Sequence, residues 1–121
     1  MSEWTEICRY DELLVDRGVA AIVDGVPVAV FRMSDGGLAV IDNRDPVSGA
    51  NVMSRGLVGT KGDITYVASP MYKQRFDIAT GRCLDDDEVA VTVHSGRTQD
   101  GRVEVLLAGA IHQLVSWADA S

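Results

Sequence analysis

The chain has 121 residues, 46% of them hydrophobic, which is the size of one domain with a single buried core. Its net charge of −7 opposes binding to nucleic-acid phosphates and to anionic lipid surfaces. No apolar run approaches the roughly 20 residues that cross a bilayer, and the first residues do not resemble a signal peptide. We therefore expect a cytoplasmic protein with no nucleic-acid or membrane partner, whose two cysteines, Cys8 and Cys83, stay reduced.

Short β-branched runs alternate with glycine and aspartate turn signals along most of the chain. A short helix is expected first, over Asp11 to Val15, with Asp11 as its cap. The Asp24-Gly25 pair then separates two apolar runs, and this arrangement is the strongest short-range signal for a β-hairpin. Turn signals recur about every eight to twelve residues, which is typical of a β-sandwich or small barrel. The expected strands are 19–23, 26–31, 38–41, 64–68, 75–78, 89–95 and 103–107.

Two segments differ from this pattern. Residues 43–63 contain four glycines and little alternation, so they are predicted to form an extended loop. This loop is expected to be ordered because it carries apolar anchors at Val47, Val52, Met53, Leu57 and Val58. Near the end of the chain, apolar residues recur at helical spacing, at Ala110, Ile111, Leu114, Val115 and Ala118. The sequence therefore predicts a β-domain over 1–108 and a helical extension over 109–121.

Two motifs resemble the cluster-binding loops of a Rieske domain. The segment Asp45-Pro46-Val47-Ser48-Gly49-Ala50 resembles the first loop, where Cys-Pro-His-x-Gly-Ala is usual. Residues 69–81 resemble the second loop, Cys-Pro-x-His-Gly-x-x-Phe-Asp-x-x-Thr-Gly. The resemblance implies an all-β, Rieske-like [2Fe-2S] ISP-type β-sandwich or barrel of about eight to ten short strands, followed by a short C-terminal α-helix.

The ligands of the cluster are missing from both motifs. A Rieske centre needs two cysteines on one iron and two histidines on the other. In this alignment the cysteine positions hold Asp45 and Ser69, and the histidine positions hold Val47 and Tyr72. No cysteine or histidine of the chain lies in either loop. We therefore expect no iron–sulfur cluster, no other cofactor, no metal ion and no self-contained catalytic site in this chain.

Further segments resemble the small subunit of assimilatory NAD(P)H-dependent nitrite reductase. They are Asn43-x-Asp45-Pro46, residues 54–59, residues 68–74 and Gly81-x-Cys83-Leu84, and the resemblance runs from Trp4 to about Leu107. It implies an oxidoreductase subunit of nitrate assimilation that works with a large subunit. That partner is expected to carry FAD, sirohaem and a [4Fe-4S] cluster and to reduce nitrite to ammonium.

The two loops lie in the basic part of an acidic sequence. Residues 44–82 hold six basic and three acidic side chains, whereas the remainder holds five basic and fifteen acidic ones. These charges either only offset their neighbours or form a face that docks on an acidic region of the large subunit. The candidate docking residues are Arg44, Arg55, Lys61, Lys73, Gln74 and Arg75.

The sequence also predicts roles for single residues and leaves two alternative functions open. Asp45 is expected to accept amide protons in its turn, and Tyr72 to fill the space of the missing cluster with its hydroxyl on a loop backbone group. His94 is expected to be structural or solvent-facing, and residues 85–88 a solvated acidic turn. The alternative functions are a scaffold module with another partner and a Rieske electron carrier with unusual ligands.

Overall fold

The computed structural model describes residues 4–109 as short strands with two 3₁₀ turns. The strands are β1 (Thr5–Arg9), β2 (Gly18–Val23), β3 (Val26–Arg32), β4 (Leu38–Asp42), β5 (Leu57–Lys61), β6 (Ile64–Ala68), β7 (Arg75–Asp77), β8 (Val93–Gln99) and β9 (Arg102–Leu106). The 3₁₀ turns are η1 (Tyr10–Glu12) and η2 (Met53–Arg55). The predicted all-β class is confirmed.

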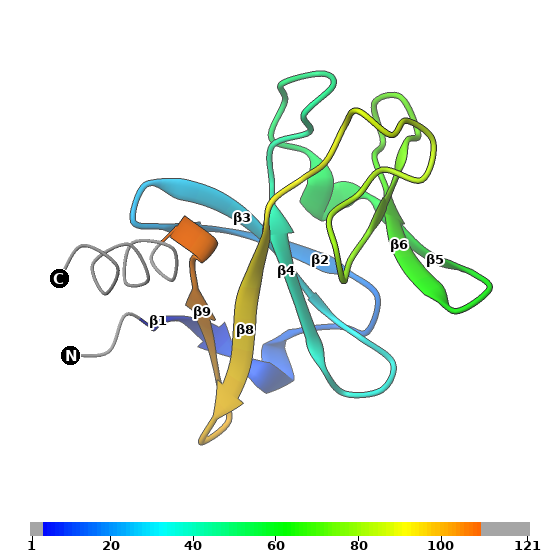
Figure 1. Cartoon of the computed structure of the whole chain (residues 1–121). Coiled ribbons are helices and arrows are strands. Elements are labelled where there is room, and N and C mark those ends of the chain that lie inside the picture. Colours follow the sequence, from blue (N-terminus) through cyan, green and yellow to red (C-terminus); the bar gives the residue numbers. More distant parts are fainter. Residues whose placement is uncertain (1–3, 110–121) are drawn as a thin grey trace, which may run out of the picture.

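The strands form two antiparallel sheets. A six-stranded sheet has the order β1-β9-β8-β4-β3-β2, and a three-stranded sheet has the order β5-β6-β7. Figure 1 shows the smaller sheet projecting from one side of the larger one. Long connections gather at one end of the molecule, beyond the ends of β4 and β6, and the β8–β9 turn lies at the opposite end.

Two Asp-Gly turns fix the register of the large sheet. Asp24 and Gly25 have φ angles of 48° and 81°, and Asp100 and Gly101 have 54° and 76°. Both central residues of a two-residue type I′ hairpin need positive φ, which glycine and aspartate tolerate better than most residues. The hairpins β2–β3 and β8–β9 close on these turns, which confirms the hairpin predicted at Asp24-Gly25 and the predicted connection through Asp100-Gly101.

The core consists of two clusters separated by β3 and β4. One lies inside the curved large sheet and contains Leu13, Val23, Val28, Val30, Val40, Val103 and Val105. The other lies between the sheets and contains Ala29, Phe31, Ala39, Ile41, Met53, Val67, Phe76, Cys83 and Val91. Because β3 and β4 bury both faces, they are nearly continuous apolar runs instead of alternating ones.

The predicted loop over 43–63 is wrong in its second half, which contains η2 and the whole of β5. Glycine reads as a turn signal in sequence, but Gly59 lies within β5 opposite Tyr66. A Cβ atom at Gly59 would lie 2.5 Å from the Tyr66 hydroxyl, so the strand needs glycine there. The first strand, β1, was also missed.

Two other boundaries differ from the prediction. The expected helix at 11–15 is instead η1 (Tyr10–Glu12), whose N-cap is Arg9 and not Asp11. The turn stops there because the next residue, Leu13, is extended and drawn into the core with 1% of its surface exposed. The last predicted strand pair is shifted: β8 begins at Val93, and residues 89–92 form a loop that buries Val91 against the core. The predicted helix over 109–119 lies, apart from its first residue, outside the described residues. Within 4–109, no helix is long and apolar enough to span a bilayer.

Gly81 offers a test of how tightly the second core cluster is closed. Gly81 and Gly25 have the same φ of 81°, but a Cβ atom at Gly81 would lie 2.1 Å from the Val91 carbonyl oxygen, whereas at Gly25 it would meet nothing within 4 Å. We expect Gly25→Ala to lower the free energy of unfolding by about 1 kcal/mol, from backbone strain alone. Gly81→Ala should cost about 1–3 kcal/mol more, because rigid backbone must move. Urea unfolding of both variants measures the difference, and equal losses would contradict it.

Candidate functional site

The two motif loops meet at the end of the molecule where the long connections gather. Loop 1 (residues 43–52) leaves β4 of the large sheet, and loop 2 (residues 69–74) joins β6 to β7 of the small sheet. A hydrogen bond of 2.5 Å runs from the Ser69 hydroxyl to Oδ2 of Asp45. Both residues have 1% of their surface exposed. The two positions that would hold cysteine ligands are therefore joined directly by a buried hydrogen bond.

The same backbone turn forms the base of each loop. The amide two residues after Asp45 donates to its carboxylate at 2.8 Å, and the amide four residues after it donates to its carbonyl at 2.7 Å. Ser69 accepts from the corresponding amides at 3.2 and 2.9 Å. In both loops the fourth residue has positive φ: Gly49 at 79° and Lys73 at 61°. Both loops thus keep the turn of a ligand-bearing loop, with side-chain oxygens of Asp45 and Ser69 accepting the hydrogen bonds. The prediction that Asp45 accepts amide protons in its turn is confirmed.

Hydrogen bonds hold Asp45 in its ionised form. Burial by itself raises the pKa of this carboxyl, but donors from Ser69 and from the Val47 and Ser48 amides outweigh it, and the pKa lies below the ordinary 3.8. A carboxylate that accepts several such bonds is an acceptor only, so the Ser69 hydroxyl is the donor of the pair.

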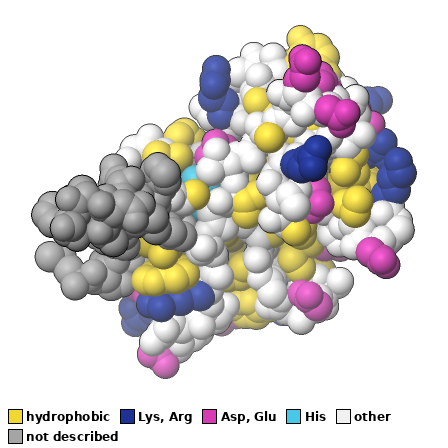
Figure 2. Space-filling view, viewed as in Figure 1, with side chains coloured by type: hydrophobic (Ala, Val, Ile, Leu, Met, Phe, Trp, Pro, Cys, Tyr) yellow, Lys and Arg dark blue, Asp and Glu magenta, His cyan; other side chains and the backbone are white. Residues whose placement is uncertain are grey.

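The former histidine positions point outward. Val47 is 42% exposed and Tyr72 is 61% exposed, and Met71 beside it is 48% exposed. The expectation that Tyr72 fills the space of the cluster is therefore wrong, because the Asp45–Ser69 pair occupies the base of the loops and leaves Tyr72 to solvent. We call Val47, Met71, Tyr72 and Lys73 the tip surface. In Figure 2, hydrophobic side chains reach the surface at this end of the molecule among acidic and basic ones.

These residues do not fit a Rieske cluster. Such a centre needs two thiolates and two imidazoles on the loop tips, whereas the tips offer a carboxylate already bound to a hydroxyl, a valine and a phenol. Elsewhere, the Cys83 thiol is buried in the core between the sheets. Within the described part of the chain, no group of three or more histidine, cysteine or acidic side chains is arranged to hold a metal ion.

His94 has a structural place away from the loops. Its Nε2 lies 2.7 Å from Oδ1 of Asp42, and its Nδ1 accepts a hydrogen bond of 3.0 Å from the Ala108 amide. Because Nδ1 accepts from an N–H, the proton of the neutral ring sits on Nε2 and is donated to Asp42. The ring is buried, and it fastens the end of β9 to β4.

The structure alters the charge pattern that the sequence window indicated. Arg75 is committed to Asp85, with its Nη2 2.6 Å from Oδ1 and its Nε 3.2 Å from Oδ2. These bonds lower the pKa of Asp85 to about 2. The pairing brings the acidic turn over residues 85–88 next to loop 2, although the turn lies outside the basic window in sequence. The tips are consequently mixed in charge, and their exposed apolar side chains are the clearer feature.

The remaining candidate docking residues are dispersed. Arg44 is exposed in loop 1, where it forms a backbone bridge to Asn51, and Arg55 is exposed at the end of η2. Lys61 ends β5 at the β5–β6 turn, away from the loop tips (Figure 1). Gln74 is half-buried beside Lys73, and its Oε1 is buried without a hydrogen-bond partner. The structure therefore brings only Lys73 and Gln74 of the six to the tip of loop 2, with Arg75 at its base.

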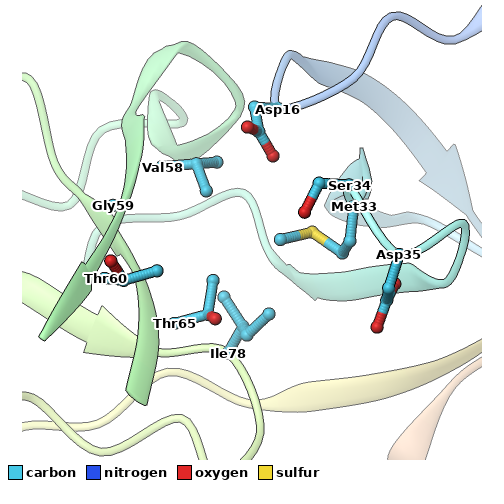
Figure 3. A pocket seen from close by; sticks show the side chains of 9 residues that line it. All are labelled: Asp16, Met33, Ser34, Asp35, Val58, Gly59, Thr60, Thr65 and Ile78. Carbon is cyan, nitrogen blue, oxygen red and sulfur yellow. The ribbon is translucent and has the colours of Figure 1, made fainter. Parts of the chain in front are cut away.

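A pocket of about 240 Å³ lies between the sheets and contains hydroxyl and carboxyl groups. Figure 3 shows Asp16 and Asp35 on different sides of it, and they do not point toward one another. Asp35 already accepts a 2.8 Å hydrogen bond from the Gly37 amide. The pocket thus lacks a paired acid and base, and we assign it no chemistry.

Sequence reasoning missed two features of the site. It placed Asp45 and Ser69 at separate ligand positions without pairing them with each other, although an acid and a hydroxyl at both cysteine positions could have indicated the bond. It also gave Met71 no role. Met71 stands at the x of the Cys-Pro-x-His-Gly motif, next to Tyr72. An apolar residue at this position of the loop could have indicated an exposed contact residue.

Comparison with known proteins agrees with this geometry. Residues 3–106 match the family described as Rieske-like [2Fe-2S] domain. The chain is 41% identical over 107 residues to the nitrite reductase (NADH) small subunit of Salmonella typhimurium, covering 87% of this chain and 98% of that one. A crystal structure from Mycobacterium tuberculosis, assigned as an NADH-dependent nitrite reductase small subunit, superposes with a TM-score of 0.82 and 47% identity, covering 84% and 92% of the two chains. The chain is also 38% identical over 118 residues to part of the nitrite reductase [NAD(P)H] large subunit of Klebsiella oxytoca, covering 98% of this chain and 12% of that protein.

The Asp45–Ser69 bond predicts a specific effect of Ser69→Ala. The substitution leaves a buried carboxylate without one donor, so we expect it to lower the free energy of unfolding by about 1–3 kcal/mol at neutral pH. It also removes the strongest influence that lowers the pKa of Asp45, so this pKa should rise. A lowered folded-state pKa gives stability that is present above the unfolded value and lost as pH falls through the folded one. Acid unfolding of Ser69→Ala should therefore begin at higher pH.

A ¹³C NMR titration of the Asp45 carboxyl measures the pKa, and urea unfolding measures the stability. Ser34→Ala is the matched control, because Ser34 is an exposed serine that lines the pocket between the sheets and does not contact Asp45. An unchanged Asp45 pKa in Ser69→Ala would contradict the role assigned to the bond.

Proposed function

The chain belongs to the Rieske-like [2Fe-2S] family and, within it, to the nitrite reductase small subunits; from this premise we propose that it is a cluster-less docking subunit of NAD(P)H-dependent nitrite reductase. It is one component of an oxidoreductase whose other component is the large subunit. The observation that carries the cluster-less assignment is the buried hydrogen bond between Ser69 and Asp45, which joins the two cysteine positions of the motif. The role left to the loops is contact with the large subunit.

The relative from Klebsiella oxytoca supports the choice of partner. There, a segment similar to nearly all of this chain forms 12% of the protein named as the large subunit. A domain that is fused to a partner in one organism and separate in another is expected to occupy a fixed place beside that partner in both. FAD, sirohaem and [4Fe-4S] groups are expected in the large subunit, and the complex is expected to work in the cytoplasm.

The tip surface has the composition of a contact site. Met and aromatic side chains are enriched at the centres of protein interfaces, and Tyr72, Met71 and Val47 are all more than a third exposed. Lys73 lies beside them in a left-handed conformation, with φ of 61°. For a residue with a Cβ atom this conformation costs roughly 1 kcal/mol relative to glycine. Strain of this kind is often kept where a side chain has a task.

The other members of the candidate docking set have separate parts in the proposal. Arg75 shapes the base of loop 2 through Asp85. Gln74 lies half-buried beside Lys73 and supports the tip of loop 2 from within, since its Oε1 is buried. Arg44 lies in loop 1, Arg55 at the end of η2 and Lys61 at the distant β5–β6 turn, and these charges contribute to the approach of an acidic partner at longer range. A scaffold module with another partner is distinguished by co-purification from native extract, where recovery of a sirohaem flavoprotein supports the proposed function.

Iron binding tests the cluster-less assignment. The purified chain should be colourless and should take up no cluster when incubated with iron and sulfide, because its tips supply none of the four ligands. The quadruple variant Asp45→Cys, Val47→His, Ser69→Cys and Tyr72→His should take up two irons and turn brown, since the loop frame is retained. A control variant that carries only the two cysteines should bind less iron and lack the Rieske EPR signal. A brown wild-type protein would contradict the assignment.

Lys73 allows binding to be separated from stability. Lys73→Gly should raise the free energy of unfolding by roughly 1 kcal/mol, because glycine tolerates positive φ. The same variant should weaken binding to the large subunit, because the charge is lost. Lys73→Glu should weaken binding further, and more at low salt, without relieving the strain. Urea unfolding and titration against purified large subunit measure the two effects.

Arg9→Glu is the matched control for this charge change. Arg9 is an exposed arginine at the end of β1, and β1 pairs there with β9 next to the Asp100-Gly101 turn, far from the tips. Its reversal should leave binding within about threefold of wild type. Equal effects of Arg9→Glu and Lys73→Glu would mean that only net charge matters and would refute the tip surface as a contact site.

A further inference from the structure

Strand β2 is an edge of the large sheet that η2 covers only at its Gly18 end. The large sheet has two edge strands, β1 and β2. The β1 edge carries the charged residues Glu6 and Arg9, an irregularity of register, and an ion pair of 2.9 Å from Arg102 to Glu6. Charges and bulges of this kind keep an edge from pairing with another chain. The β2 sequence, Gly-Val-Ala-Ala-Ile-Val, has no charge, no proline and no bulge.

The open hydrogen-bonding groups of β2 belong to Ala20 and Ile22. Pro27 has no N–H, and its carbonyl accepts from the Asn43 amide at 3.0 Å, on the β4 side of β3. Its partner Ile22 therefore directs its own N–H and C=O away from β3, and so does Ala20, two residues earlier. Within residues 4–109 these groups have no hydrogen-bond partner. Ala20 is exposed, and Ile22 is 73% exposed.

A hollow beside this edge leads to loop 1. It has a volume of about 380 Å³ and is lined by Ala20, Ala21, Ile22, Pro27, Asn43 and Asn51. Its floor is apolar strand, and its rim is polar loop. A second hollow of about 360 Å³ adjoins the Gly18 end of the strand and includes Arg17 and Arg55. The edge therefore combines free backbone groups with recesses that could receive side chains.

We propose that β2 accepts one extended strand of the large subunit, which pairs with the backbone of Ala20 and Ile22 and places an apolar side chain in the hollow beside loop 1. This inference rests on the proposed function and extends the contact from the tip surface to the sheet edge. Addition of a strand to an exposed edge supplies main-chain hydrogen bonds for affinity and recesses for specificity. Loop 1 belongs to both surfaces, since it carries Val47 at its tip and Asn51 in the hollow.

Charge determines which occupant fits the edge. A second copy of this chain would bring together two molecules that each carry a net charge of −7, which opposes pairing through β2. The charges at the Gly18 end and in loop 1 are basic on balance, with three exposed arginines, Arg17, Arg55 and Arg44, and one exposed acid, Asp16. The incoming strand is therefore expected to be apolar at its centre, with acidic residues beside Gly18. In this proposal Arg44 and Arg55 bind the incoming strand directly, a more specific role than long-range attraction of the partner to the loop tips.

Two lysine substitutions on the same strand test the proposal. Ile22→Lys puts a charge at the rim of the hollow, whereas Val19→Lys puts the same charge on the opposite face of β2, where the side chain is 37% exposed and the backbone bonds to β3. We expect Ile22→Lys to weaken binding to purified large subunit by roughly tenfold or more. Val19→Lys should change it less than about threefold. Thermal unfolding of both variants checks that the fold is intact.

Amide hydrogen exchange of the wild-type chain gives a second readout that needs no variant. The amides of Ala20 and Ile22 should exchange fast in the free chain and slow by roughly tenfold or more in the complex, and those of Val19 and Ala21 should be protected in both. If Lys73→Glu weakens binding while Ile22→Lys and the exchange of β2 do not respond, the edge proposal is wrong and the proposed function stands. If the wild-type chain does not bind the large subunit at all, the proposed function fails. If the free chain dimerises and Ile22→Lys abolishes the dimer, the occupant is a second copy and the proposal is overturned.

Discussion

The hydrogen bond from Ser69 to Asp45 ties together the two halves of this fold. Loop 1 continues from β4 in the large sheet, and loop 2 connects two strands of the small sheet, so the bond closes the gap between the sheets at their loop end. In a Rieske domain the cluster makes this connection through metal–ligand bonds. Here an ionised carboxylate and a hydroxyl make it at 2.5 Å, and three donors to Asp45 offset the cost of burying its charge.

Once the bases of the loops are joined in this way, the tips no longer have to present ligands. The histidine positions instead hold Val47 and Tyr72, which both lie at the surface and belong to the proposed contact site. Lys73 stands where the Rieske motif has glycine, and it keeps the positive φ that the turn demands. The loop thus keeps the backbone geometry of the Rieske motif although the cluster ligands of the motif are replaced. The loop frame that positions metal ligands in a Rieske domain here positions Met71, Tyr72 and Lys73.

The sequence predicted what is local and missed what is brought together in space. The Asp24-Gly25 turn, the strands around it and the two loop frames follow from short motifs, because few backbone conformations satisfy them. Strand β5 was missed because Gly59 reads as a turn residue until Tyr66 is placed opposite it. Residues 44–82 do carry an excess of basic side chains, but this excess does not describe the surface charge around the loops. Asp85 lies outside this stretch of sequence and pairs with Arg75. Likewise, only the order of the strands reveals that β2 is an edge.

Loop 1 carries part of both proposed contacts, the tip surface and the β2 edge. Its tip carries Val47, its base carries Asp45, and its far side forms the rim of the hollow with Asn43 and Asn51. Two contacts at one loop restrict the orientation of a bound partner more than either contact alone. A strand paired with the β2 edge would set the direction of the partner's chain, and the tip surface would set its position along the edge. The buried bond between Asp45 and Ser69 then has a second consequence. By joining the base of loop 1 to loop 2, it keeps the two proposed contacts in a fixed position relative to each other.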